Sequence, residues 1–262
     1  MADRDAKFYH FDGLAAFADD CERNNALHNA SESWAGGSAK DALAYARQGD
    51  ISQVAKAESL LDQLDSEIDS NSVRPVWMPS VVGNFPIVPA YLAGTPEAMM
   101  ARSDVPDARG EVEIWANTTV SSSCKARDMM RRGVVTMAFA MALARTRNVK
   151  IVLYSTCDKS NVAIRLSSPL DISEVCAAFC QPSITRQLIY GHADLDGFTG
   201  HWADWAEVKR SREAERKALG KYAGMPADAV HLSTETLGEY SSMTDDKLVE
   251  ILNAKIREYM ER

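Results

Sequence analysis

The stretch that decides the fold covers residues 111–155 and reads EVEIWANTTVSSSCKARDMMRRGVVTMAFAMALARTRNVKIVLYS. Its pattern predicts a strand at 112–117, a polar loop, a helix at 125–147 and a second strand at 149–158. Parallel strands need a crossover of this length, and a helix usually supplies it. We therefore expect the core of an α/β domain to begin here.

The residues that follow continue this alternation of strand and helix patterns. We expect strands at 161–169 and 229–234, and helices at 170–180, 182–194, 203–222 and 244–262. Strands that alternate with helices favour a mainly parallel sheet covered on both faces. The sequence thus predicts a doubly wound α/β core over residues 110–262.

The residues before this core follow different patterns. After a short helix at 12–25, two helices at 38–48 and 51–69 are expected to form a helical hairpin. Residues 70–110 contain six prolines, which disfavour long helices and central strands, so we expect an ordered wrap with short edge strands. One helical turn is expected within it at 96–102. Residues 1–109 are therefore predicted to be a hairpin and a proline-rich wrap packed on the core.

Composition restricts the classes of partner. The 262 residues carry a net charge of −8, with a pI near 5.2. Overall acidity disfavours nonspecific binding to nucleic acid or to anionic membranes, since both attract cationic surfaces. Five cysteines without a disulfide pattern favour a reducing compartment. With no signal peptide and no apolar run long enough for a bilayer, we expect a cytoplasmic protein that does not contact membranes.

The polar loop after the first core strand is the main candidate site. Asn117, Thr119 and Ser121 alternate along it, so their side-chain oxygens can point to one side. Ligands of open parallel sheets bind at the carboxyl ends of strands, beside helix N-termini. Oxygen atoms suit a hard cation. These three residues are therefore predicted to hold a divalent cation such as Mg²⁺, with side chains that only cap the helix as the alternative.

A second candidate site lies at the start of the following helix. Its side chains are hydroxyls and cations, which together with a helix N-terminus can receive a phosphate. A solvated helix face is the alternative explanation. The predicted anion-binding residues are Ser122, Ser123, Lys125, Arg127 and Arg131.

The loop and its flanking strands resemble the von Willebrand factor A domain, whose metal site has the pattern Asp-x-Ser-x-Ser at this position. The resemblance covers roughly residues 110–260 and implies a Rossmann-like sheet and a protein partner. The chain departs from the pattern, since Asn117 replaces the aspartate and Thr119 the first serine. Loss of the carboxylate implies weaker metal binding. Thr156 and Asp158 match later ligands by position only.

Other patterns point less directly to chemistry. His192, Asp194 and His201 could serve a metal-dependent hydrolase, although their spacing specifies no geometry. Mixed charges at 209–221 are typical of a solvated helix face. No phosphate loop, nucleophile elbow or dinucleotide fingerprint is present in the sequence, which favours a non-enzymatic protein and leaves a metal-dependent hydrolase as the alternative.

The whole chain also resembles an uncharacterised protein family of tailed bacteriophages, which implies the cytoplasm of an infected host cell. The most distinctive segment of the resemblance is 86–99. Its motif residues are Trp34, Gly36, Gly37, Ser38, Ala42, Gly49, Val82, Gly83, Pro86, Val88, 90–94, Pro96, Met99, Asn117, Thr119, Ser121, Arg132, Gly133, Pro182, Ser183 and Arg186.

Two functions follow from these observations. The first is a non-enzymatic binding or scaffold protein that engages a protein partner through loop 117–123, with or without a weakly bound divalent cation. The second is a nucleic-acid or phosphate binder that uses the Ser/Lys/Arg cluster at 121–132.

Overall fold

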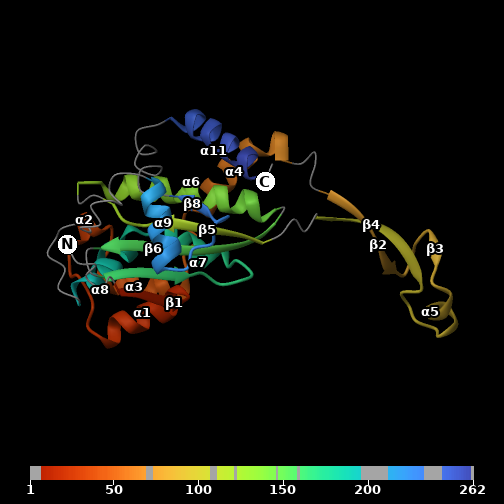
Figure 1. Ribbon diagram of the computed structural model, residues 1–262, viewed down its shortest axis with the longest axis horizontal. Coiled ribbons are helices and arrows are strands. Elements are labelled where there is room, and N and C mark those ends of the chain that lie inside the picture. Colours follow the sequence, from red (N-terminus) through yellow and green to blue (C-terminus); the bar gives the residue numbers. More distant parts are fainter. Residues whose placement is uncertain are drawn as a thin grey trace.

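A five-stranded sheet forms the centre of the molecule (Figure 1). The computed structural model describes residues 7–68, 73–106, 111–120, 123–145, 147–157, 160–195, 212–232 and 244–260. The strand order is β1-β7-β6-β5-β8, and every pair is parallel except β6 with β7. The predicted α/β class with a mainly parallel sheet is therefore confirmed. The strands are β1 Lys7–Asp12, β5 Glu111–Asn117, β6 Asn148–Cys157, β7 Ser160–Arg165 and β8 Val230–Leu232.

Side chains alternate between the two faces of this sheet, and helices cover both. On β5, Ile114 and Ala116 join the larger core, whereas Trp115 joins a smaller core on the opposite face. The smaller core includes Leu219 of α9, Arg212–Tyr222. The larger core packs residues from α1 Leu14–Arg23, α3 Ala39–Gln48, α4 Val54–Ile68, α6 Ala126–Ala144, α7 Ile172–Cys180, η1 Ile184–Ile189, α8 Tyr190–Asp194 and α11 Asp245–Met260.

Strand β1 was not expected from the sequence. It pairs in parallel with β7, and Gly13 N donates to Arg165 O at 2.7 Å just beyond it. The pairing joins segments more than 150 residues apart, so local patterns carry little information about it. Its cluster of aromatic residues was the available signal, because such residues favour strands.

The two helices predicted as a hairpin, α3 and α4, pack against different elements. α3 contacts α1, α7 and η1, whereas α4 contacts α6 and α11. The turn between them is bonded to α7 instead, because Asp50 N donates to Ser173 O at 2.9 Å and Asp50 Oδ2 accepts from Gln181 Nε2 at 2.7 Å. Ser38 does begin α3 through a capping box with Asp41, as its position predicted.

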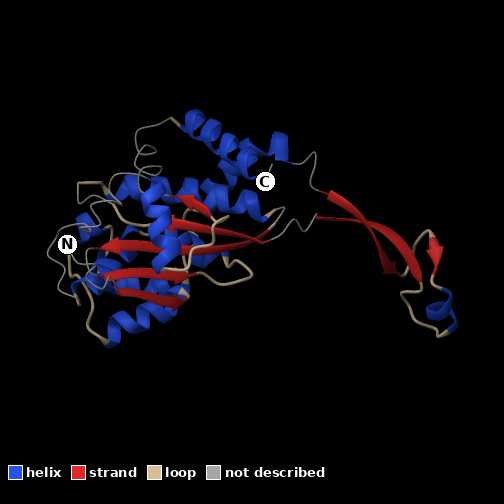
Figure 2. Ribbon diagram, in the orientation of Figure 1, coloured by secondary structure: helices blue, strands red, loops and turns tan. Residues whose placement is uncertain are grey.

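The proline-rich segment forms a three-stranded antiparallel arm in the order β2-β4-β3. Figure 2 shows it lying apart from the five-stranded sheet. Prolines occur within both edge strands, whereas the central strand contains only Pro106 at its end, as expected for a residue without an amide hydrogen. The helical turn expected at 96–102 is absent, because most of that segment lies in the central strand. The arm comprises β2 Val73–Ser80, β3 Phe85–Pro86, α5 Val88–Leu92 and β4 Met99–Pro106.

Helix α6 crosses very close to α7, and Gly133 makes this possible. A Cβ atom on Gly133 would lie 1.9 Å from the backbone oxygen of Phe179. A real side chain would therefore force the helices apart. This close crossing places Arg132 beside the carboxyl end of α7.

No helix in the described part of the chain is long and apolar enough to span a membrane. The division at residue 109 and the cytoplasmic location stay predictions.

Candidate functional site

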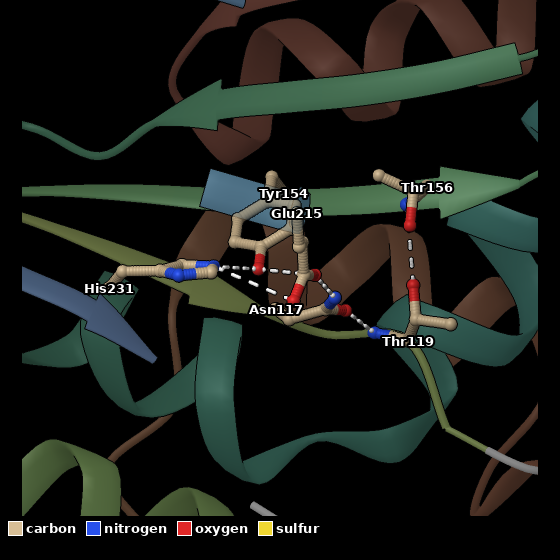
Figure 3. Close-up of polar contacts among 6 residues, drawn as sticks. All are labelled: Asn117, Thr119, Tyr154, Thr156, Glu215 and His231. Carbon is tan, nitrogen blue, oxygen red and sulfur yellow. Dashed lines mark hydrogen bonds and ion pairs between the residues drawn. The ribbon is translucent and has the colours of Figure 1, made fainter. Parts of the chain in front are cut away.

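Asn117 ends β5 and is buried, with both polar atoms of its side chain engaged. Its Oδ1 accepts from Thr119 N at 2.7 Å, which forms a local turn. Its Nδ2 donates to Glu215 Oε1 at 2.8 Å (Figure 3). An aspartate here would place a second carboxylate against Glu215, which like-charge repulsion disfavours. This contact gives a physical reason why position 117 carries an amide, whereas the von Willebrand factor A pattern has a carboxylate there.

Thr119 is also held inside the protein. Its Oγ1 lies 2.9 Å from Ser155 Oγ and accepts from Thr156 N at 3.4 Å. Ser121, the third predicted cation ligand, lies outside the described residues. Thr119 therefore connects the ends of β5 and β6, and a cation at this loop stays a prediction.

Glu215 is the centre of a buried polar network that joins three strands to α9. Tyr154 OH donates to Glu215 Oε1 at 2.8 Å and lies 2.7 Å from His231 Nε2. His231 Nε2 lies 3.7 Å from Glu215 Oε2. Tyr154 and His231 are at most 1% exposed, and Glu215 is 6% exposed. Figure 3 shows Asn117, Tyr154 and His231 directed at the carboxylate.

This network resembles acid–base machinery in composition but lacks access. A catalytic group must reach the atom that it protonates, and these groups are covered by α9 and the sheet. Buried polar groups that are hydrogen-bonded to one another instead fix one arrangement of the surrounding elements. The arrangement therefore holds α9 on the sheet.

The predicted anion-binding residues are dispersed around the start of α6. Ser123, Lys125 and Arg127 are exposed, and Arg131 is half-buried. Arg127, whose side chain is 87% exposed, lies 3.9 Å from Asp128. Ser122 lies outside the described residues. Anion binding by these residues stays a prediction.

A small cavity lies between the end of β5, α6 and the turn after α7. Its volume is about 20 Å³, far below the roughly 300–1,000 Å³ of pockets for small-molecule ligands. Arg132 lines it together with Thr118, Gln181 and Thr185. Burial lowers the pKa of Arg132 to about 10, since the charged form loses hydration; nearby Cys124 and Tyr190 act in the opposite direction.

A second arginine, Arg186, is fully buried beside the loop that precedes α6. It donates to Trp34 O and Cys124 O, and its Cζ lies 4.2 Å from the centre of a Trp34 ring. Burial lowers its pKa as well. The residue belongs to η1, a π-helical turn, and such turns often occur at functional sites. Arg186 thus anchors the loop to α2, Glu32–Ala35.

His192 and Asp194, two of the residues suggested for a hydrolase site, have different partners. His192 is buried against Tyr9 and Phe11, with Nε2 3.5 Å from Asp20 Oδ2. Asp194 Oδ2 instead lies 2.8 Å from His28 Nδ1. His201 is outside the described residues, and among those described no group of three or more acids, histidines and cysteines could hold a metal ion.

A family model described as "Domain of unknown function (DUF7192)" matches residues 4–250, nearly the whole chain. The chain belongs to the DUF7192 family. No curated protein and no solved structure matches it.

In this DUF7192 domain, sequence patterns located the polar edge of the sheet but missed its buried members. Glu215 lies in a segment whose mixed charges predicted a solvated face. Leu219 and Ala223 follow Glu215 at intervals of four, and this apolar spacing was the signal that one face is buried. His231 and Tyr154 gave no comparable signal, because they stand alone within apolar strands.

Proposed function

We propose that this chain is a non-enzymatic binding or scaffold protein that engages a protein partner. The observation that carries the proposal is the surface of the arm. Of the large apolar side chains exposed in the described residues, seven lie in the arm and three elsewhere. The seven are Met78, Val81, Val82, Phe85, Val88, Tyr91 and Leu92.

The tip of the arm is unusual because it exposes apolar groups with a single charge among them. Glu97 is the only charged residue between positions 78 and 100. Leu92 and Val82 are each 79% exposed, and Tyr91 is 69% exposed. Apolar patches of this kind mark interaction sites on soluble proteins. A partner with an apolar groove and few charges would fit this surface.

Loop 117–123 is the second contact in this proposal, as the sequence predicted. Its support is its position at the carboxyl end of β5, the usual ligand-binding edge of such sheets. The antiparallel β6–β7 pair beside parallel β5 and β6 is compatible with a core like that of the von Willebrand factor A domain. A bacteriophage origin, and thus a host-cell cytoplasmic setting, belongs to the same proposal and is supported by the motif residues alone.

Affinity capture from expressing cells, with identification of bound proteins by mass spectrometry, tests the arm. We expect the pair Tyr91→Ser and Leu92→Ser to abolish capture of the partner. Ile51→Ser is the matched control, because Ile51 is 72% exposed but lies outside the arm. Equal capture of the partner by the wild type, the double variant and Ile51→Ser would exclude the arm as the binding surface.

The cation at loop 117–123 has a separate test. If Mg²⁺ binds Asn117, Thr119 and Ser121, it should raise the melting temperature in a saturable way. An unchanged melting curve at millimolar Mg²⁺ would remove the cation and leave the protein-binding proposal in place.

Nucleic-acid or phosphate binding is the second candidate function. Lys125 and Arg127 favour it, since both are exposed at the start of α6. Binding to single-stranded RNA should then weaken with salt and be lost on combining Arg127→Ala with Arg131→Ala. Absence of binding at low salt would exclude this function.

A further inference from the structure

Side chains from three neighbouring strands converge on the Glu215 carboxylate of α9 (Figure 3). Asn117 Nδ2 and Tyr154 OH each donate to Oε1 at 2.8 Å, and His231 Nε2 lies 3.7 Å from Oε2. The three strands, β5, β6 and β8, are mutually parallel, and Asn117 ends β5 opposite Tyr154 in the register. Open parallel sheets bind ligands at this edge. The carboxylate therefore occupies a position that a ligand takes in such sheets.

The three groups around Glu215 suit a carboxylate of another molecule equally well. An amide and a phenol donate hydrogen bonds, and an imidazole carries a positive charge when it is protonated. Hydrogen bonds to an ionised acceptor are about twice as strong as those between neutral groups. Asn117, Tyr154 and His231 are all buried on the strands of the main sheet, which fix their positions. A site arranged in advance in this way loses little entropy when a ligand binds.

Helix α9, which carries Glu215, has few apolar groups with which to hold the sheet. Six of its eleven residues are charged. Leu219 is the only large apolar side chain that α9 buries, whereas Tyr222 is 37% exposed. The opposite face of the sheet is covered by several helices with extensive apolar packing. The attachment of α9 therefore depends largely on the contacts of Glu215.

The connection from α9 to β8 contains a glycine that suits a hinge. Gly224 has a φ of +76°, and a Cβ atom there would meet nothing within 4 Å. Glycine adopts this conformation without steric cost, and the open space leaves room for the backbone to turn. Rotation about Gly224 would separate Glu215 from the three strands and break the bonds from Arg216 Nη2 to the carbonyls of Ala227 and Ala229.

We propose that Asn117, Tyr154 and His231 form a binding site for the carboxylate of a ligand, and that α9 is a hinged lid whose Glu215 fills this site in the closed state. A ligand then binds by taking the place of Glu215. Its apparent affinity is reduced by the small fraction of molecules in which the lid is open. The site takes no part in the contacts of the arm, so it goes beyond the proposed protein-binding function.

Titration of Glu215→Ala with sodium formate tests the site, with sodium chloride used to keep the ionic strength constant. Formate should raise the melting temperature in a saturable way, because it replaces the missing carboxylate. The wild type and the control Glu213→Ala, an exposed position on the same helix, should need at least tenfold more formate. Adding Tyr154→Phe to Glu215→Ala should weaken formate binding by about tenfold. An absent response, an equal response of the wild type, no effect of Tyr154→Phe, or equal stabilisation by neutral formamide would overturn the proposal.

Hydrogen exchange of the wild-type chain in increasing urea tests the lid, and it decides the question even if Glu215→Ala does not fold. Local opening exposes amides without global unfolding, so its rate depends little on urea. The amides of α9 should exchange at least tenfold faster than those of β6, with a much smaller dependence on urea. If α9 and β6 exchange at the same rate and with the same urea dependence, α9 is not a lid.

Discussion

The α9 face of the main sheet and the tip of the arm contrast in how they place polar and apolar groups. Under α9, a carboxylate, an amide, a phenol and an imidazole are buried together. On the arm, valine, phenylalanine, tyrosine and leucine side chains are exposed. Burying polar groups requires complete partnering, whereas exposing apolar groups leaves surface for another molecule to cover. The first region is thus organised for internal order and the second for association.

The largest expected effect is at the centre of the buried network. Glu215→Ala would leave the Asn117 amide and the Tyr154 hydroxyl without their acceptor. We expect it to lower the free energy of unfolding by about 2–4 kcal/mol, measured by urea denaturation. Glu213→Ala is the control, as Glu213 is exposed on the same helix, and it should change stability by less than about 0.5 kcal/mol. Similar losses in both variants would mean that the network does not fix α9.

Two glycines in helices allow a tightly packed position to be compared with an exposed one. Gly133→Ala would place Cβ 1.9 Å from Phe179 O, so we expect a loss of about 1–3 kcal/mol in stability. Gly220→Ala lies on the exposed side of α9, where its Cβ would be 3.5 Å from the nearest atom, Met225 O. This change should stabilise by roughly 0.5–1 kcal/mol, since alanine favours helix. A neutral Gly133→Ala would contradict the close crossing of α6 and α7.

A smaller effect concerns the turn that Asp50 bonds to α7. Burial alone would raise the pKa of Asp50, but hydrogen bonds from Gln181, Ser52 and Cys176 outweigh it and lower the pKa. The charged form is therefore favoured in the folded state. The stabilisation from the charged Asp50 carboxylate is complete above 3.8, the ordinary pKa of the group. It is lost as the pH falls through the lower pKa of the folded state.

Asp50→Asn should therefore cost about 1 kcal/mol at neutral pH and reduce the loss of stability below pH 4, as followed by thermal melting. If the melting temperature of Asp50→Asn falls with decreasing pH as steeply as that of the wild type, this role for Asp50 is excluded.

The smallest effect on stability is expected on the arm. Phe85 and Leu92 are 58% and 79% exposed, so replacing either by serine removes little buried surface. Each change should alter the free energy of unfolding by less than about 0.5 kcal/mol. A loss above 1 kcal/mol in urea denaturation would show that the arm packs against the body, and the contrast between the two regions would then disappear.

Local patterns predicted those elements whose signals lie within a few turns of chain. Ser38 marked the start of α3, and the apolar run within 125–147 marked α6. The same reasoning missed β1, whose partner β7 is remote in sequence. Nor did it reveal that the Asp50 turn between α3 and α4 is bonded to α7. These contacts join remote segments, and no local pattern encodes them.

The residues of the candidate site also differ in whether local sequence patterns could predict them. The polar edge after β5 was predictable, because ligand sites of parallel sheets follow strand ends. The partners of Asn117 were not, since Glu215 is 98 residues away. Spacing along α6 marked Arg127 and Arg131, whereas packing against α7 placed Arg132 at the cavity.

The sequence by itself determined the class of fold, the positions of most helices, and a proline-rich segment too apolar for a free linker. These properties depend on periodicity, turn residues and composition, which act over short distances. Only the tertiary structure decided that Glu215 is buried, that Arg132 faces a cavity, and that the proline-rich segment exposes its apolar groups. Those outcomes depend on which remote surfaces meet, and the burial of each side chain follows from that assembly.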